Sequence, residues 1–389
     1  METEKLYYAD PFLTDFTVTV LDCQPGKNGY LVTLDRTAFY PEGGGQPADH
    51  GVLDGAVVTD VHEKNSVILH NVDRAVEIGK TVTGTIDWGR RFDHMQQHSG
   101  EHICSGLICE RFHCDNVGFH MGADIVTIDF NADISWEELL EIEAKANQYL
   151  YENHPIDIQF HRGAELEAID YRSKKALEGD VRIVAFPGAD CCACCGTHVL
   201  RSGQVGLVKF LSVQKFREGV RIELLCGKRA LEYLSRTWEQ AKAIGQRLSV
   251  KPVDSEAAVE RLEGELASLK LRCAQLEESV FESMAKEQAG KGNVLLFQPA
   301  MRPDSVRRLM DAVSKTCCGL AAVFAGEEGH YAYALGRADG QDISPLVKAM
   351  NTALHGRGGG RNGFAQGSVE TERSAIESFF KENGYGICD

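Results

Sequence analysis

The sequence lacks any long apolar run. No stretch of its 389 residues approaches the ~18 consecutive apolar residues that a membrane-spanning helix needs. The first residues, METEKLYYADPFLTDF, are acidic and aromatic and show no basic segment followed by an apolar one, so no secretory signal peptide is predicted. We therefore expect a soluble, cytoplasmic protein with no membrane partner.

Basic residues are fewer than acidic ones. The chain has 41 Lys and Arg against 57 Asp and Glu, a formal net charge of −16. This balance argues against a protein that coats nucleic acid without specificity, but it leaves room for one structured RNA bound through a local basic face. The region 291–389 carries as many basic as acidic residues and is the less repulsive surface for RNA.

Cysteine, in contrast, is plentiful. The 13 cysteines are an odd number in a long chain without secretory features, so reduced thiols are expected, with metal ligation as a reason to cluster them. The cluster is DCCACCGTHVL, residues 190–200. It contains Cys191, Cys192, Cys194, Cys195 and His198.

The pattern of apolar residues predicts an α+β protein of several domains. Short β-branched segments over 15–87 indicate a small N-terminal β-barrel, and a change of period near residue 89 predicts a helix. A second helix should begin at Ser135, which forms a capping-box spacing with Glu138. We predict a β-barrel at 1–87, an α+β domain at 88–228, a helical hairpin or coiled coil at 229–290 and an α/β domain at 291–389.

The helical region carries a heptad seam, in which apolar residues alternate at spacings of three and four. The sequence does not decide whether this seam packs within the chain or joins two chains, so a homodimer through the helical or C-terminal region is one expected partnership. The seam residues are Val259, Leu262, Leu266, Leu269, Cys273, Leu276 and Val280.

The segment HSGEH predicts half of a metal site. His98 and His102 are four residues apart on the predicted helix, so both imidazoles lie on one face, where one ion can be chelated. His94 lies one turn earlier. The same letters also fit the H-x-x-E-H peptidase pattern with Glu101 as general base, but the pattern is short and specifies no third ligand.

The cysteine cluster supplies the other half. Cys194 and His198 in CCGTH complete a set of one thiolate and three imidazoles, which suits Zn²⁺. The neighbouring thiols Cys191, Cys192 and Cys195 are rival ligands. Two overlapping C-x-x-C pairs keep a structural zinc knuckle or a redox site open as alternatives.

Four motifs in order resemble the editing half of alanyl-tRNA synthetase and its free-standing relatives, the AlaX trans-editing proteins. RTAFYPEGGGQPADHG is similar to the family's glycine loop, HSGEH to its H-x-x-x-H and CCGTH to its C-x-G-T-H. GRGGGRNGFAQGSV resembles the signature of the DHH-associated C-terminal domain of its long forms. Glu101 departs from the small or neutral residue common at that place in the synthetases.

The resemblance implies a trans-editing hydrolase that deacylates mischarged tRNA(Ala), chiefly the seryl and then the glycyl form. The alternative is a noncatalytic zinc-containing tRNA-binding module, with a metallopeptidase third. Too few residues precede the glycine loop for an aminoacylation domain, so tRNA charging is not expected. No Asp-His-His motif precedes the C-terminal domain, which argues against a manganese phosphoesterase.

The resemblance also assigns site residues. It implies one Zn²⁺ per chain, which would activate water or bind the substrate's amino group. A four-ligand site would be closed, so one ligand must be loose, the coordination must expand, or the ion mainly organises the pocket. The implied ligands are His98, His102, Cys194 and His198. The residues expected at the reaction are His98, His102, Gln46 and Thr197.

Two glycine-rich segments complete the expected sites. Gly43, Gly44, Gly45 and Gln46 would bind substrate, because glycines let backbone N–H groups approach closely; a tight turn between strands is the plainer interpretation. In the last domain, arginines would contact RNA phosphates, and the glycines among them would let the RNA backbone approach. The alternative is that this glycine-rich segment is only a structural turn. These tRNA-binding residues are Arg357, Gly359, Gly360 and Arg361.

Overall fold

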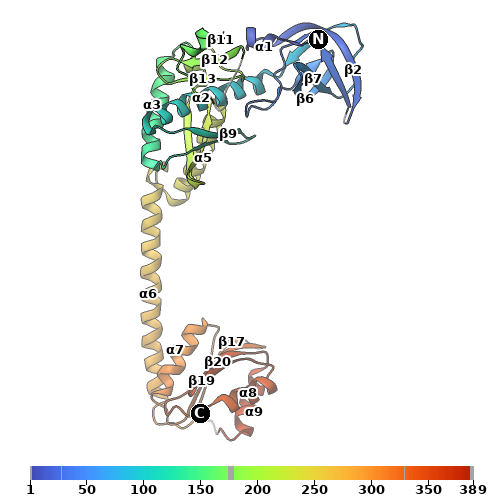
Figure 1. The fold of residues 1–389 in the computed structure, drawn as a ribbon. Helices are drawn as coiled ribbons and strands as arrows, with labels where there is room; N and C mark the ends of the chain where they lie inside the picture. Colours follow the sequence, from blue (N-terminus) through green and yellow to red (C-terminus); the bar gives the residue numbers. More distant parts are fainter. Residues whose placement is uncertain (1, 28, 174–178, 328, 386–389) are drawn as a thin grey trace. The chain divides into compact units, whose positions relative to one another are not determined.

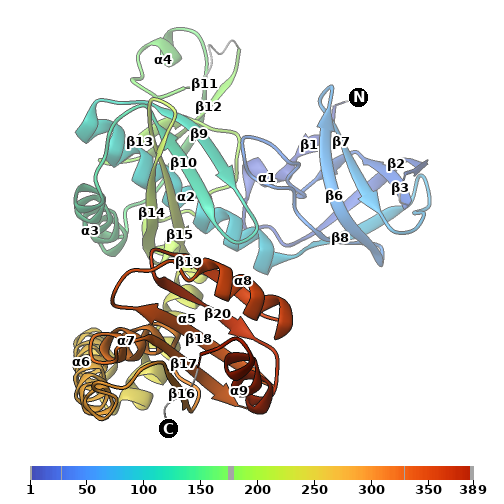
Figure 2. The same ribbon diagram turned by 90° about the horizontal axis from the view of Figure 1, so that it is seen from below.

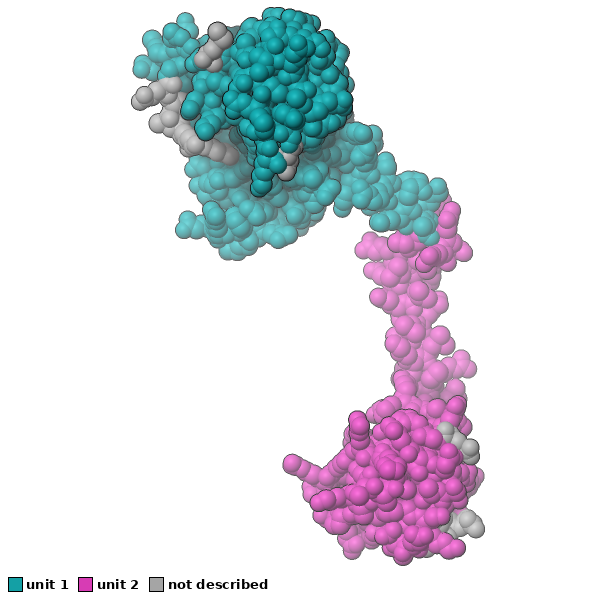
Figure 3. All heavy atoms as spheres, turned by 90° about the vertical axis from the view of Figure 1, so that its right-hand side faces the viewer, with its two compact units in different colours: residues 1–243 teal, residues 244–389 magenta. Residues whose placement is uncertain are grey.

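The computed structural model describes residues 2–27, 29–173, 179–327 and 329–385. The chain divides into two compact units, Met1–Ala243 and Ile244–Asp389 (Figure 3). The boundary lies within helix α5 (Gly227–Leu248). The four-part division expected from the sequence remains a prediction.

The N-terminal part of the first unit is a closed barrel of six strands in the order β2-β3-β7-β6-β5-β8, with antiparallel neighbours. Strands form because β-branched residues alternate with polar ones; in β8, for example, every second residue is buried. The strands expected over 15–87 are therefore present. They are β2 (Asp15–Gly26), β3 (Gly29–Leu34), β5 (Gly51–Leu53), β6 (Ala56–Lys64), β7 (Val67–Val72) and β8 (Thr81–Ile86). A short β1 (Glu4–Lys5), α1 (Leu6–Ala9) and β4 (Arg36–Thr37) accompany them.

Helix α2 (Trp88–Phe112) follows the barrel and carries HSGEH (Figure 1). It begins at the N-cap Asp87, whose side chain accepts from the Arg90 amide, and ends at His113 in the left-handed conformation. Gly100 allows close packing, since a Cβ at this position would overlap the Cys226 Sγ atom of β15. The glycine between the two histidines therefore lets the ligand-bearing helix lie close to a strand.

Two sheets pack around α2. One has the order β14-β15-β10-β9, and the other the order β11-β12-β13. The expected helix near 135 is α3 (Trp136–Glu152), and the Ser135–Glu138 capping box is formed. The remaining elements are β9 (Asn116–Met121), β10 (Val126–Phe130), β11 (Asp157–His161), α4 (Ala164–Glu167), β12 (Val181–Phe186), β13 (Asp190–Ala193), η1 (Ser202–Val205), β14 (Val208–Phe216) and β15 (Gly219–Cys226).

A buried ion pair connects the glycine loop to α2. The Arg91 guanidinium is fully buried, and its Nε donates to Asp49 Oδ1 at 3.0 Å. It also donates to the carbonyls of Pro11 (2.9 Å) and Ala38 (2.6 Å), while Asp49 Oδ2 accepts from the Tyr40 amide at 2.6 Å. This network holds both ends of the loop against the first turn of the helix.

The second unit contains a five-stranded sheet in the order β16-β17-β18-β20-β19 (Figure 2). Apolar clusters cover both of its faces. Helix α7 packs on one face and α8 and α9 on the other, so this unit contains both strands and helices, as expected of an α/β domain. The elements are β16 (Val294–Gln298), α7 (Pro303–Ser314), β17 (Leu320–Glu327), β18 (His330–Arg337), α8 (Ser344–Ala353), β19 (Arg357–Arg361), β20 (Phe364–Val369) and α9 (Arg373–Glu382).

Helix α6 (Ser255–Glu287) carries the heptad seam and follows the short turn η2 (Pro252–Asp254). Its seam residues are exposed; Leu269, for example, is 58% exposed. Coiled-coil pairing of this seam therefore stays a prediction. Within the described ranges, no helix combines the length and apolarity needed to cross a membrane.

Candidate metal centre

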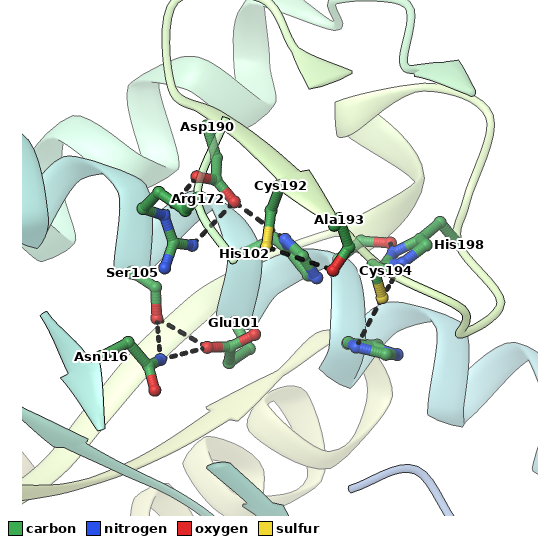
Figure 4. A network of polar contacts seen from close by, with 12 residues as sticks. Glu101, His102, Ser105, Asn116, Arg172, Asp190, Cys192, Ala193, Cys194 and His198 are labelled. Atoms are coloured by element: carbon green, nitrogen blue, oxygen red, sulfur yellow. Dashed lines mark hydrogen bonds and ion pairs between the residues drawn. The ribbon is translucent and has the colours of Figure 1, made fainter. Parts of the chain in front are cut away.

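The four predicted ligands converge on one point. His98 and His102 come from α2, and Cys194 and His198 from the loop after β13. Figure 4 labels three of these residues, His102, Cys194 and His198. Their ligand atoms all lie within 4.8 Å of one another. The Cys194 Sγ is 3.5 Å from His98 Nε2 and 3.3 Å from His198 Nε2. A single ion can be held by three imidazoles and one thiolate at this point.

Each ligand imidazole is held at its Nδ1 atom by an oxygen from elsewhere. His98 Nδ1 is 2.9 Å from Gln46 Oε1, and His102 Nδ1 is 2.8 Å from Asp190 Oδ2. His198 Nδ1 is 3.2 Å from Ser99 Oγ. Such partners fix the orientation of a ligating imidazole, and they leave each Nε2 available for a metal.

Asp190 is a site residue that the sequence did not reveal. It is buried, and besides contacting His102 it forms a bidentate ion pair with Arg172. The Arg172 Nε donates to Oδ1 at 2.7 Å and Nη2 donates to Oδ2 at 2.9 Å. Burial opposes ionisation, but hydrogen bonds from His102 and Arg172 hold the pKa of Asp190 below its usual value. The only signal was its place directly before the cysteine cluster.

Arg182 of β12 fixes the loop that carries the other two ligands. Its guanidinium is buried and donates to the carbonyl oxygens of Cys194 (2.8 Å) and Gly196 (2.9 Å). Gly196 lies so near the centre that a Cβ there would overlap the His98 imidazole. The glycine of CCGTH is therefore required by the close approach of loop and helix.

The structure favours Cys194 over its neighbours as the thiolate ligand. Burial by itself raises the pKa of the Cys194 thiol. The nearby His98 and His198 outweigh burial and hold this pKa well below the ordinary thiol value. Burial raises the pKa of Cys192 to about 11, although this thiol also lies near His102 and Asp190. All cysteines in the described ranges are free, so the overlapping C-x-x-C pairs form no disulfide there.

Gln46 and Thr197 contact each other beside the ligand His98. Both are fully buried; Gln46 Nε2 donates to Thr197 Oγ1 at 2.8 Å, and the Thr197 amide donates back to Gln46 Oε1 at 3.1 Å. The Gln46 amide is thus occupied by His98 and Thr197. This arrangement favours a role in positioning the metal ligands over direct contact with substrate.

The glycine loop forms a tight turn. Gly43 and Gln46 exchange backbone hydrogen bonds of 3.1 and 3.0 Å, and Gly44 and Gly45 have φ values of 61° and 88°. A Cβ at Gly45 would also press on Phe119. Gly44 lines the cavity beside the metal centre, so it is the part of the loop best placed to meet a ligand.

That cavity has a volume of about 390 Å³ and a mostly apolar wall. A molecule the size of an aminoacyl group fits such a space. Besides the ligands His98, His102 and Cys194, the lining residues are Gly44, Glu101, Asn116, Phe119, Arg172, Ser173, Asp180, Val181, Arg182, Cys192, Ala193 and Cys195.

His94 does not line this cavity. It lines another cavity, together with Arg90 and Arg229, and no described residue bonds its Nδ1 atom. Burial, with the nearby arginines, lowers the pKa of His94 to about 3. The sequence left its role open, and the structure separates it from the four ligands.

The arginines and glycines expected to bind tRNA lie on β19, an edge strand of the second unit. All five residues of this strand are exposed. A Cβ at Gly360 would overlap the Phe364 carbonyl, so its lack of a side chain serves strand pairing. Gly359 and Gly360 also line a cavity of about 310 Å³ beside α8. Arg357 and Arg361 flank these glycines.

Three family models match the chain. The model described as tRNA synthetases class II (A) matches residues 6–90, and the threonyl and alanyl tRNA synthetase second additional domain matches 181–223. The DHHA1 domain matches 290–382. The alanyl-tRNA editing protein AlaX-L of Pyrococcus horikoshii is 29% identical, over 96% of each chain. The chain is thus similar to a long-form AlaX protein over nearly its whole length.

Longer relatives match the chain as well. The alanine–tRNA ligase of Pyrococcus abyssi is 32% identical over 98% of this chain, and that of Natronomonas pharaonis is 37% identical over 73%. The chain spans only 44% and 32% of these ligases. A solved C-Ala domain from Aquifex aeolicus alanyl-tRNA synthetase covers 25% of the chain at 20% identity, with a TM-score of 0.22.

Proposed function

We propose that this AlaX-type chain is a trans-editing hydrolase. It would remove a wrong amino acid, chiefly serine and secondarily glycine, from tRNA(Ala) in the cytoplasm. The observation that carries the proposal is the convergence of three imidazoles and a thiolate beside a cavity, in a chain with AlaX-type domain content. The reaction is hydrolysis of the ester between the amino acid and the terminal ribose.

The donor set fits one zinc ion. Three imidazole nitrogens and one thiolate are borderline-soft ligands, and the oxygen partners of the three Nδ1 atoms complete a site of the usual zinc type. When bound there, zinc supplies a Lewis-acidic centre for ester hydrolysis. His98, His102, Cys194 and His198 would hold it.

The chain itself supplies position and shelter. Gln46, Ser99 and Asp190 fix the ligand imidazoles, and Phe119 stacks on the His98 ring with centroids 5.2 Å apart. An aminoacyl ester is intrinsically labile, so holding it near an oriented water provides much of the catalysis it needs. The apolar wall strengthens each polar contact that the substrate makes.

The C-terminal domain would hold the tRNA. Arg357 and Arg361 would contact phosphates, and Gly359 and Gly360 would admit the RNA backbone. Contacts of this kind position a substrate without reading its sequence.

The decisive test presents the purified protein with Ser-tRNA(Ala), Ala-tRNA(Ala) and a casein digest. We expect rapid loss of serine from the first substrate only. The double variant Cys194→Ala/His98→Ala should lose this activity. Unchanged deacylation by the double variant would overturn the assignment of the metal centre.

The alternatives predict other results. A noncatalytic tRNA-binding module would bind Ser-tRNA(Ala) and release no serine. A metallopeptidase would cut casein with Glu101 as base. The Glu101 carboxylate is instead held by Ser105 and Asn116 and lies outside the group of four ligand atoms, which favours the esterase.

A further inference from the structure

Glu101 occupies a special place in the metal centre without being one of its four ligands. It immediately precedes His102 on α2 and is only 4% exposed. Its side chain lines the same cavity as His98 and His102. The carboxylate therefore faces the space where the aminoacyl group would lie.

One carboxylate oxygen of Glu101 is fully occupied. Oε1 accepts from Ser105 Oγ at 2.6 Å and from Asn116 Nδ2 at 2.8 Å, and Asn116 also donates to Ser105 at 2.8 Å (Figure 4). The Gly118 amide donates to Asn116 Oδ1 at 3.2 Å, which orients the amide. This network sets the direction of the carboxylate, and no described residue donates to Oε2.

Glu101 also differs from the other carboxylates at this cavity in its ion pairing. Among the residues that the structure describes, no Arg, Lys or His side chain forms an ion pair with it. The other two carboxylates at this cavity are paired, Asp190 with Arg172 and Asp180 with Arg162. A buried carboxylate without a counter-ion is costly, so a site that retains one is suited to a cationic ligand.

We propose that Glu101 recognises the α-ammonium group of the aminoacyl ester through Oε2. This assignment rests on the proposed function. The ammonium stands on the carbon next to the ester carbonyl, so a carboxylate beside the metal centre can bind it while the ester faces the ligands. Seryl and glycyl esters share this cation, and Glu101 therefore selects aminoacyl groups as a class, leaving side-chain discrimination to other contacts.

The test compares Ser-tRNA(Ala), Gly-tRNA(Ala) and glyceroyl-tRNA(Ala), in which nitrous acid has replaced the α-amine of serine by a hydroxyl. Wild-type kcat/KM should be roughly tenfold or more higher for the seryl than for the glyceroyl ester, as expected for a charge-assisted hydrogen bond. Glu101→Gln, which keeps the shape and removes the charge, should lower both aminoacyl values by that factor. The glyceroyl value should change by less than roughly twofold.

Two controls accompany it. Glu110→Gln removes an exposed carboxylate from the same helix and should change none of the three rates. Zinc content, measured by mass spectrometry, should be equal in wild type and variant. If Glu101→Gln fails to fold, Asn116→Ala releases the orienting bond and should narrow the seryl-to-glyceroyl ratio in the same direction.

Other outcomes would overturn the assignment. An equal loss on seryl and glyceroyl esters at full zinc content would make Glu101 a general base or a structural residue. A loss on the seryl ester without one on the glycyl ester would mean that it reads the serine hydroxyl, and no loss would mean no contact. If wild-type protein hydrolyses none of the three esters, the proposed function itself fails, and this assignment with it.

Discussion

Gln46, Ser99 and Asp190 each bond the Nδ1 atom of one ligand imidazole, and they come from three separate parts of the chain. Removing such a partner frees the ring to rotate and lets the wrong tautomer form. At the scale of single residues, the strength of metal binding should therefore depend on side chains that never touch the ion.

Asp190→Asn should lower zinc affinity by roughly 10- to 100-fold, because the amide no longer provides a charged acceptor for His102 and Arg172. Competition with a chromophoric chelator measures this change. Asp180→Asn, which alters an exposed carboxylate at the same cavity, serves as the control and should leave the affinity unchanged. Equal affinities for Asp190→Asn and wild type would contradict the role given to Asp190.

Cys194→Ser should abolish stoichiometric zinc binding, because the only thiolate of the ligand set is lost. Cys191→Ser, Cys192→Ser and Cys195→Ser should each retain the ion. Metal analysis of the four purified variants separates ligand from neighbour. Loss of zinc in Cys192→Ser would instead support the group formed by His102, Asp190 and Cys192.

At the scale of elements, the barrel and α2 are joined through buried polar groups. Arg91 at the start of the helix bonds Asp49 and two backbone carbonyls of the barrel region, with no exposed surface. His70 on β7 bonds Thr37 Oγ1 at 2.9 Å and the Val32 carbonyl at 3.0 Å inside the barrel. The free energy of unfolding of the first unit should therefore depend on the charge of Arg91 and on the protonation of His70.

Arg91→Met should destabilise the first unit by about 3–5 kcal/mol, because Asp49 would remain buried without its cation. Urea unfolding followed by circular dichroism measures the loss. The matched change Arg74→Met removes an arginine paired with an exposed aspartate and should cost about 0–1 kcal/mol. A loss of that small size for Arg91→Met would show that the buried pair contributes little.

His70 should make barrel stability fall with acid. Burial lowers its pKa to about 4 in the folded state, while the unfolded side chain titrates near 6.5. The unfolded chain therefore takes up the proton first as the pH falls below 6.5. The stabilisation from neutral His70 is complete above pH 6.5, declines below it and is lost by pH 4.

The amount lost should be about 3 kcal/mol of unfolding free energy between pH 6.5 and pH 4. His70→Gln cannot take up this proton, so its unfolding free energy should fall by less over the same range. Urea titrations of both proteins at several pH values provide the comparison. Parallel curves for the two proteins would show that His70 is not the group responsible.

At the scale of the whole molecule, the proposed metal centre and the expected RNA contacts lie in different compact units. The four ligands belong to Met1–Ala243, and the strand with Arg357 and Arg361 belongs to Ile244–Asp389. Helix α6 of the second unit carries an exposed apolar seam, and a homodimer through this seam remains a prediction.

Arg357→Ala/Arg361→Ala should weaken tRNA binding and reduce the slope of log affinity against log salt by about 1–2, since each phosphate contact contributes nearly one unit. Filter binding across a salt series measures both quantities. Lys381→Ala on α9 removes an exposed cation of the same unit and serves as the control. An unchanged slope in the double variant would remove β19 from the RNA-binding surface.

Much of the ligand set could be predicted because it depends on local geometry or short motifs. His98 and His102 share a helix face through their spacing alone, and CCGTH carries the other two ligands. The glycine loop was predicted as a substrate contact or a turn, and its backbone bonds make it a tight turn with only Gly44 at the cavity. The use of Gln46 by His98 and Thr197 could not be seen, because it joins residues far apart in the chain.

The sequence by itself determined the strands of the barrel region, the Ser135 cap of α3 and the shared helix face of His98 and His102, since alternation, caps and i,i+4 spacing act within a few residues. The choice of Cys194 among its neighbouring cysteines came from the resemblance of CCGTH to the AlaX motif. Only the tertiary structure decided which oxygen orients each imidazole, that His94 lies at another cavity and that Glu101 lines the site with no ion-pair partner among the described residues. Those facts depend on which side chains from distant segments meet after burial. Local sequence patterns do not predict such long-range side-chain contacts, because the same pattern can pack against many different partners.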